Sequence, residues 1–393
     1  MGFPQQKLGD VCRLINGRAY KKHEMLTEGP YPILRVGNFF TNRSWFYSDL
    51  QLHEDKYCDN GDLLYAWSAS FGPRIWEGQK VIYHYHIWKI EIDETKVDKN
   101  YMFHLLDWDT EQIKLAQGTG TTMVHVTKGS MENRLLPFPP IPEQHRIVAI
   151  LDQAFADIEK ARVNAEKNLK NARELFDSYL NQVFSQRGED WVELSLKEAS
   201  IDFGRGKSKH RPRNDESLYG GDYPFVQTGE VRNCNHVINN YAKTYNEKGL
   251  AQSKLWPKGT ICITIAANIA ETGILGFDGC FPDSIIGVVV DPKVTRVSYV
   301  EFLLQSFRLI LKAKGQGSAQ DNINLGTFEN MKFPFPTIKD QEEIIALLGE
   351  LTTNIQRVEE VYLAKLVAIE ELKKSLLQKA FSGELTKDKG IAA

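Results

Sequence analysis

Two copies of one sequence pattern make up this chain, and that duplication constrains its fold more than any other feature. Residues 118–144 read GTGTTMVHVTKGSMENRLLPFPPIPEQ, and residues 315–341 read GQGSAQDNINLGTFENMKFPFPTIKDQ. The two segments align without gaps at an offset of 197, which is half of the 393 residues to within one residue. Nearer the start of each copy, YPILRVGN at 31–38 resembles YPFVQTGE at 223–230. A repeat of this length predicts two similar domains in tandem.

Each copy divides into a β-rich first part and a helical second part. Runs of β-branched residues, TICITIA at 260–266 and SIIGVVVD at 284–291, predict strands, and the alternating run KVIYHYHIWKIEI at 80–92 predicts another. Gly and Pro are frequent between such runs, as is usual in loops. We therefore expect an α+β fold whose two similar mixed α/β globular domains cover 1–142 and 187–339.

One long helix is predicted for the second part of each copy, over 143–186 and over 340–385, with 386–393 left as a tail. Apolar residues recur along both segments in alternating steps of four and three, which favours a coiled coil. Short linkers require the two helices to be antiparallel, which gives the chain an internal pseudo-two-fold symmetry. A helix of about 43 residues spans roughly 64 Å. The coiled-coil positions that we expect to be buried are Leu151, Ile158, Leu175, Leu348, Leu351, Ile355, Val358, Ile369 and Leu372.

Composition excludes several classes of protein. Apolar residues make up 42% and charged residues 25%, as in ordinary globular domains. The five cysteines are scattered without a C-x-x-C pair, which argues against a disulfide framework and against a zinc site. No apolar run reaches the roughly 18 residues of a membrane helix, and MGFPQQKLGD at the start lacks the features of a signal peptide. We expect a cytoplasmic protein.

Two similar globular domains held at a fixed distance suggest a protein that binds two sites at a fixed separation. B-DNA is the natural ligand for such a protein, because its grooves repeat regularly along the helix. The net charge of −3 does not by itself indicate a DNA-binding protein. The charge is unevenly distributed, however, because 143–185 and 340–382 carry six and five Lys/Arg against seven and eight Asp/Glu. RGKSKHRPR at 205–213 holds five Lys/Arg and no acid, and NGRAYKKH at 16–23 holds three at the equivalent position. Such basic loops could bind phosphates, although two solvated loops would also fit.

Two further pairs of segments match between the copies. GTGTT at 118–122 and GQGSAQ at 315–320 could expose backbone N–H groups to phosphates, or could simply form tight turns. After the YP strands, Arg35 stands opposite Gln227, a difference that two domains with different target sequences would need. The candidate DNA-binding residues are Arg18, Tyr20, Lys21, Lys22, Arg35, Asn38, Thr119, Thr121, Arg205, Lys207, Lys209, Arg211, Gln227, Arg232, Gln316, Ser318 and Gln320.

In their order and duplication, these segments resemble the specificity subunit of a type I restriction–modification system. The resemblance includes the YP strands, the glycine-containing loops, the PFPPIPEQ and PFPTIKDQ entries into the helices, and the closing LLQKAFSGEL at 376–385. It implies two target recognition domains that each read one half of a bipartite site in double-stranded DNA, with the helices setting the spacer. It also implies docking of two methyltransferase subunits and of motor–nuclease restriction subunits. S-adenosylmethionine, ATP and magnesium would then belong to those partners, with no cofactor in this chain.

Catalytic motifs in the chain are incomplete. Asp202 to Gly206 imitates the D-x-G-x-G loop of a methyltransferase, but the basic run that follows does not predict a helix. Asp283, Asp291 and Lys293 formally fit a nuclease pattern, although Pro292 would break the strand that such a site needs. No phosphate-binding G-x-x-x-x-G-K-[ST] loop is present.

His84 and His86 alternate in the expected strand without a suitable third metal ligand nearby in the sequence. The leading interpretation is therefore a non-catalytic DNA-binding subunit. Two alternatives remain, a coiled-coil adaptor whose heads bind proteins and an autonomous nuclease.

Overall fold

Two compact units form in the computed structural model of the chain, one of Met1–Glu166 with Ala364–Ala393 and the other of Lys167–Leu363. We call them the first and the second unit. The structure describes residues 2–41, 44–68, 72–117, 126–186, 188–210, 212, 215–266, 269–308, 310–311 and 323–387. Within these residues, no helix is long and apolar enough to cross a membrane.

Two four-stranded sheets form the globular part of the first unit. The first sheet is antiparallel in the order β2 (Cys12–Asn16), β9 (Ile87–Ile92), β6 (Leu63–Ala66) and β7 (Gly72–Ile75). The second has the order β4 (Phe46–Ser48), β3 (Tyr31–Leu34), β8 (Val81–Tyr83) and β5 (Tyr57–Cys58), with β3 and β8 parallel. The helices of this part are α1 (Val36–Thr41), α2 (Lys99–Gln117) and α3 (Lys128–Glu132).

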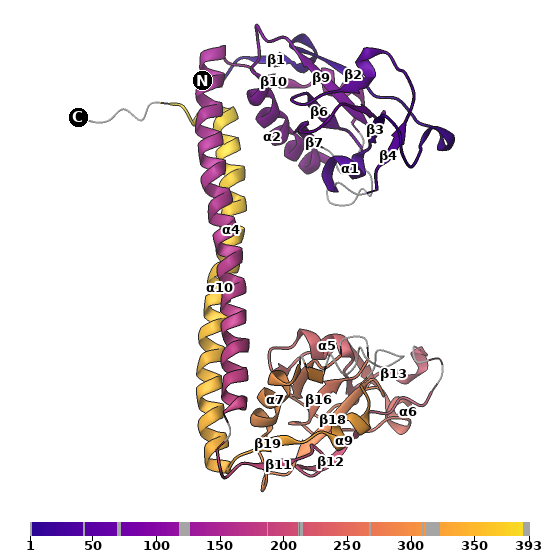
Figure 1. Cartoon of the computed structure of the whole chain (residues 1–393), viewed down its shortest axis with the longest axis vertical. Helices are drawn as coiled ribbons and strands as arrows, with labels where there is room; N and C mark the ends of the chain where they lie inside the picture. The colour runs from indigo at the N-terminus through magenta and orange to yellow at the C-terminus, as the bar shows by residue number, and fades with distance from the viewer. Residues whose placement is uncertain are drawn as a thin grey trace, which may run out of the picture. The chain divides into compact units, whose positions relative to one another are not determined.

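The first sheet of this unit is buried on both faces. Because side chains alternate along a strand, Leu63 and Tyr65 of β6 face the core that contains α2, whereas Leu64 and Ala66 face the second sheet. Figure 1 shows α2 lying against this sheet. The run 80–92, expected as one strand, is in fact two, because the chain leaves β8 in one sheet and enters β9 in the other through a turn at 84–86.

The second unit repeats this arrangement with a larger main sheet. Its order is β12 (Ser200–Arg205), β18 (Ile285–Val290), β16 (Ile261–Thr264), β17 (Thr272–Leu275) and β14 (Val237–Ile238). The smaller sheet pairs β13 (Tyr219–Phe225) with β15 (Lys243–Tyr245). The short helices are α5 (Thr228–Asn233), α6 (Glu247–Ala251), α7 (Val297–Ser306) and α9 (Leu325–Asn330).

Each copy closes its globular part with a two-stranded ribbon before the long helix begins. β1 (Gln5–Lys7) pairs with β10 (Leu135–Pro137), and β11 (Val192–Leu194) pairs with β19 (Phe333–Phe335). The long helices α4 (Ile141–Ser185) and α10 (Ile338–Ser382) follow, and each has 45 residues. Both begin two residues before the positions that we expect from the sequence.

A buried glutamine attaches each long helix to its globular part. The Gln341 side chain accepts hydrogen bonds from the Arg296 backbone N–H at 3.0 Å and the Thr295 hydroxyl at 2.8 Å, and it donates to the carbonyl oxygens of Val294 and Pro336. Gln144 is its counterpart in the first copy. It accepts from the Asp98 N–H at 2.9 Å and donates to two backbone carbonyl oxygens. Both glutamines are 0% exposed, so the repeated sequence encodes the same buried joint twice.

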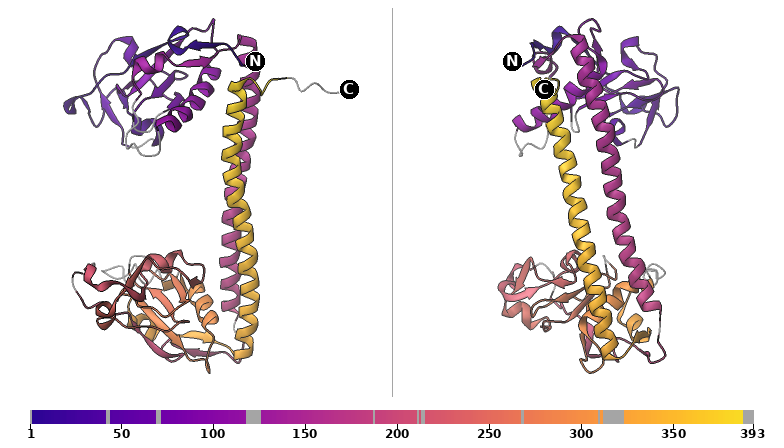
Figure 2. Two further views of the ribbon diagram at one scale, coloured as in Figure 1. Left: turned by 180° about the vertical axis from the view of Figure 1, so that it is seen from behind. Right: turned by 90° about the vertical axis from the view of Figure 1, so that its left-hand side faces the viewer.

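The two long helices are antiparallel and in contact within the second unit (Figure 2). The Asn168 side chain donates to the Tyr362 hydroxyl at 3.0 Å, and Arg173 forms a 2.6 Å ion pair with Glu359. In the first unit, the Lys373 ammonium lies 5.4 Å from the centre of the Phe155 ring. The fold that we expect, two mixed α/β halves with two long helices in contact, is therefore confirmed.

The expected coiled-coil stripe holds for most of its length but not at every position. Leu151, Leu348 and Ile369 are buried, and Ile158, Leu351 and Ile355 are half-buried. Leu175, Val358 and Leu372 are instead 60%, 39% and 49% exposed. A straight helix turns every 3.6 residues, so its contact face drifts away from a strict 3.5-residue stripe. On α4 the neighbouring residue Phe176 is half-buried and packs against the core of the second unit.

Candidate nucleic-acid interface

The two basic loops begin at structurally equivalent glycines. A Cβ at Gly17 would lie 2.3 Å from the Tyr83 carbonyl oxygen, and one at Gly206 would lie 2.3 Å from that of Phe281. Only glycine allows so close an approach. The Gly17 N–H donates to the carbonyl oxygen of Ile87, the first residue of β9. The Gly206 N–H donates to the carbonyl oxygen of Ile285, the first residue of β18. Both loops therefore leave the main sheet beside the turn that precedes β9 or β18.

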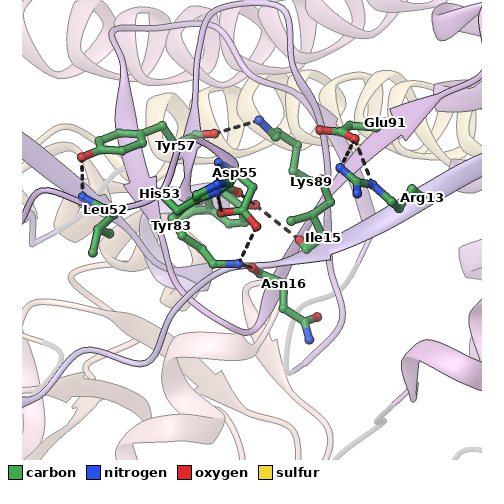
Figure 3. A network of polar contacts seen from close by, with 11 residues as sticks. Arg13, Ile15, Asn16, Leu52, His53, Asp55, Tyr57, Tyr83, Lys89 and Glu91 are labelled. Atoms are coloured by element: carbon green, nitrogen blue, oxygen red, sulfur yellow. Dashed lines mark hydrogen bonds and ion pairs between the residues drawn. The ribbon is translucent and has the colours of Figure 1, made fainter.

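Figure 3 shows the polar network that fixes the start of the first basic loop. The Tyr83 hydroxyl donates to the Asp55 carbonyl oxygen at 2.6 Å and lies 3.4 Å from that of Ile15. The Lys56 ammonium donates to the Asn16 carbonyl oxygen at 2.9 Å. These contacts join β2 to the second sheet immediately before Gly17, so the loop leaves from a fixed base.

Two of the three cationic side chains in the first basic loop are exposed, and the third, Arg18, forms an ion pair within the loop. Arg18 makes a bidentate ion pair with Glu24, with distances of 2.6 and 3.1 Å. The hydrogen bonds from Arg18 lower the pKa of Glu24 to about 2, so this pair stays charged and closes the loop. Lys21 and Lys22 are exposed, and among the described residues neither side-chain ammonium forms an ion pair, although the Lys21 backbone N–H donates to Glu24 at 2.8 Å. Tyr20 is half-buried, with its hydroxyl 3.3 Å from the Tyr83 carbonyl oxygen.

Residues after strand β3 are less available than the sequence suggests. The Arg35 guanidinium lies 4.5 Å from the centre of the Phe46 ring and donates to the Ser44 carbonyl oxygen at 2.9 Å. Asn38 is only 3% exposed, and its side-chain oxygen accepts from the Arg35 backbone N–H at 3.3 Å. Because Asn38 braces the first turn of α1, its amide does not face a DNA base in this conformation.

In the second unit, the backbone of the basic loop is held by side chains from the segment after α6. The Gln252 side-chain oxygen accepts from the N–H groups of Lys209, at 2.7 Å, and His210, at 3.1 Å. The Ser253 hydroxyl donates to the Lys207 carbonyl oxygen at 2.9 Å. Lys207 and Lys209 are exposed and have no acidic partner among the described residues. The loop thus presents its charges from a preorganised backbone.

Arg205, at the start of this loop, is exposed and donates through Nε to the Asp283 carbonyl oxygen at 2.8 Å. At the other end, His210 and Asp215 form a 2.7 Å pair. Hydrogen bonds from Ser217 and His210 lower the pKa of Asp215 to about 2, so this carboxylate is ionised at neutral pH.

Several of the candidate DNA-binding segments of the second unit line one small cavity. It has a volume of about 190 Å³ and is lined by Ser208 of the basic loop, Gln227 and Thr228 at the start of α5, Lys243, and the turn at 282–284. Arg232, at the other end of α5, lines a different cavity of about 340 Å³ together with Arg173 and Glu359 of the long helices. The structure therefore groups Gln227 with the basic loop and separates Arg232 from it.

Six of the candidate residues lie outside the described residues. They are Thr119, Thr121, Arg211, Gln316, Ser318 and Gln320.

The motifs that imitate catalytic sites are dispersed by the fold. Asp283 precedes β18 and Asp291 follows it, so a strand of six residues, roughly 20 Å long, separates the two carboxylates. Asp291 accepts from the Lys293 N–H in a turn. Asp202 to Arg205 lies in strand β12, where the Asp202 carboxylate pairs with Lys254 at 2.7 Å. Among the described residues, no group of three or more His, Cys, Asp or Glu side chains is placed to hold a metal ion.

Two supporting features were not identified from the sequence as parts of the site. Gln252 lies more than 40 residues from the loop that it holds, and no local signal points to it. The other is the turn His84-Tyr85-His86, where Trp67 donates through Nε1 to the Tyr85 carbonyl oxygen at 2.8 Å. Its run of aromatic residues is visible in the sequence, but the run also fits an ordinary strand.

Comparisons with known proteins agree on one family. The model of the type I restriction modification DNA specificity domain matches residues 3–167 and 188–363. The EcoBI specificity subunit of Escherichia coli is 23% identical, with 96% of this chain and 85% of the relative covered. The MjaVIII specificity subunit of Methanocaldococcus jannaschii is 25% identical, with 96% and 92% covered.

Solved structures share the fold. A chain from a study of complex assembly and conformational transition in the type I restriction–modification system superposes with a TM-score of 0.78 at 20% identity, with 98% of each chain covered. The HsdS subunit of Thermoanaerobacter tengcongensis gives a TM-score of 0.58 at 18% identity, with 98% and 97% covered. Because the family model spans both copies of the repeat, the chain belongs to the type I restriction–modification specificity family and is a non-catalytic specificity subunit.

Proposed function

We propose that the chain reads a bipartite site in double-stranded DNA, with one half-site contacted by each unit and an unread spacer set by the long helices. The observation that carries this proposal is the equivalent placement of the two basic loops at Gly17 and Gly206. Positive side chains leave each main sheet at the same point and beside the same turn. The surrounding residue types differ between the units, as recognition of two different sequences requires.

We further propose that the long helices dock two methyltransferase subunits and that restriction subunits join this assembly in the cytoplasm. Exposed apolar side chains on α10 support docking, because Val358 and Val361 lie one turn apart on the same face of the helix and are 39% and 63% exposed. Neighbouring exposed apolar side chains on one surface are typical of a contact with a partner. In this assembly S-adenosylmethionine, ATP and magnesium act in the partner subunits, and this chain supplies DNA recognition.

Charge neutralisation in the second basic loop tests the phosphate contacts. The double variant Lys207→Gln and Lys209→Gln should weaken binding of the assembled complex to cognate and unrelated DNA alike. The slope of log affinity against log salt should become shallower by up to about 2, because each phosphate contact contributes roughly 0.9. Titrations of labelled duplexes between about 50 and 200 mM salt measure this.

The matched control is the double variant Lys197→Gln and Lys339→Gln, whose side chains are 65% and 85% exposed and lie outside the loop. It removes the same charge and should leave the slope within error of the wild type. A slope that is unchanged in the loop variant would refute the phosphate role. Binding without salt dependence or sequence preference in the wild type would favour a protein adaptor instead.

A further inference from the structure

An aromatic column runs from the core of the first unit to an exposed tyrosine. The Tyr65 and Trp88 rings are buried and stacked at a centroid distance of 6.0 Å, and Trp88 stacks on Trp67 at 5.8 Å. The Trp67 ring then meets the edge of Tyr85 at 6.1 Å, and Tyr85 is 39% exposed. Stacked aromatic rings have few rotatable bonds, so the column forms a stiff support for Tyr85.

The backbone beneath Tyr85 is fixed as firmly as the rings. The Tyr85 N–H donates to the Arg18 carbonyl oxygen at 3.1 Å, and its own carbonyl oxygen accepts from Trp67 Nε1 at 2.8 Å. The Trp67 N–H donates to the His86 carbonyl oxygen at 3.0 Å, and the Ile87 N–H closes the turn on His84 at 2.9 Å. An exposed aromatic side chain held in one conformation loses little entropy when it binds a partner.

Tyr85 lies beside the basic loop of its unit, since the Tyr85 N–H is bonded to the backbone of that loop at Arg18. Burial, together with smaller contributions from the charges of His86 and Arg35, lowers the pKa of the neighbouring His84 to about 4, so His84 is neutral at pH 7. The turn is thus a largely aromatic surface, and its backbone is bonded to the loop that carries the exposed cations Lys21 and Lys22. In the major groove of duplex DNA, an apolar or aromatic side chain can contact the methyl group of thymine, a contact that distinguishes base pairs.

The second unit has the same turn without the aromatic rings. Ile263 pairs with Ile286 where Tyr65 pairs with Trp88, and the Ile265 N–H donates to the Ser284 carbonyl oxygen at 3.0 Å, as Trp67 does to His86. The turn itself reads Pro282-Asp283-Ser284. The backbone is therefore common to both units, and the side chains at its tip are the variable part.

We propose that Tyr85 is a specificity-determining residue whose ring contacts a base in the half-site read by the first unit. This inference rests on the proposed DNA recognition and adds a residue to it. In the second unit, Asp283 stands at the position equivalent to Tyr85. At this position one half-site would therefore be contacted by an aromatic ring and the other by a carboxylate.

The test compares Tyr85→Ala and Tyr85→Phe in the full chain assembled with its methyltransferase subunits. Binding is measured to the cognate duplex and to duplexes changed one base pair at a time. We expect Tyr85→Ala to weaken cognate binding about tenfold, equivalent to about 1.4 kcal/mol. Discrimination should be lost at one or two adjacent positions of one half-site. The salt slope should not change because no charge is removed. Tyr85→Phe keeps the ring and should stay within about twofold of the wild type.

Tyr241→Ala is the matched control, because Tyr241 is 45% exposed and packs edge-on against Phe277 at 5.1 Å in the second unit. It should leave the first half-site unaffected, and thermal unfolding should show that each variant is folded. The proposal is overturned if folded Tyr85→Ala keeps wild-type base preferences, if both half-sites weaken equally, if Tyr85→Phe loses as much as Tyr85→Ala, or if only assembly with the methyltransferase subunits suffers. A wild-type complex without any bipartite preference would instead contradict the proposed function itself.

Discussion

Replacing Gln341 by Leu should lower the free energy of unfolding of the second unit by about 3 kcal/mol. The substitution leaves the Arg296 N–H, the Thr295 hydroxyl and two carbonyl oxygens without partners in a site that is 0% exposed. A single unsatisfied buried polar group costs about 1–3 kcal/mol. The loss should be concentrated at the joint, so hydrogen exchange should accelerate most at the backbone amides near Arg296 and in the first turns of α10.

Gln182→Leu is the control for this substitution, because Gln182 is an exposed glutamine on a long helix of the same unit. Urea unfolding followed by circular dichroism should place it within about 0.5 kcal/mol of the wild type. Gln144→Leu should reproduce the loss in the first unit, because its side chain makes the same kind of contacts. Equal stabilities for Gln341→Leu and Gln182→Leu would contradict the role that we give to the buried joint.

Shortening both long helices together should shorten the DNA spacer. Removing 158–164 from α4 and 366–372 from α10 deletes seven residues from each helix, about two turns, so the apolar stripes stay nearly in register. Each helix becomes about 10 Å shorter, which corresponds to about three base pairs of B-DNA. Selection of bound sequences from a randomised duplex library measures the spacer directly.

Deleting the segment from α4 alone is the control for the paired change. It puts the two stripes out of register by two turns and should reduce the stability of the helix pair without producing a new, defined spacer. A matching insertion of seven residues in both helices should lengthen the spacer by a similar amount. A spacer that remains at the wild-type length in the paired deletion would show that the helices do not set it.

Most of the architecture could be predicted from the sequence, because the residues that repeat between the two copies are residues on which the fold depends. Gln144 and Gln341 align at the repeat offset and turn out to be the buried joints, and Gly17 and Gly206 start equivalent loops. Two long segments with no Pro beyond the first turn of either helix are likewise visible in the local pattern. The repeat marks these positions in the sequence, but the contacts of both glutamines include residues 45 to 48 positions away, which only the structure shows.

Features that depend on contacts between distant segments were harder to predict. The run 80–92 alternates as one strand would, yet it divides between two sheets, which only the pairing of β8 with β3 decides. Asn38 looks like an exposed amide after a strand, but the short helix α1 turns it inward. Leu175 keeps the expected spacing and is nevertheless 60% exposed, because the globular part of its unit packs on the adjacent face of α4.

Mapping the sites that the assembled complex methylates tests the central claim most directly. Genomic DNA without prior modification is incubated with the wild-type chain, its methyltransferase subunits and S-adenosylmethionine, and the modified bases are located by sequencing. The account predicts one motif with two specified half-sites separated by an unspecified spacer of fixed length. An uninterrupted motif, or modification without sequence preference, would contradict it.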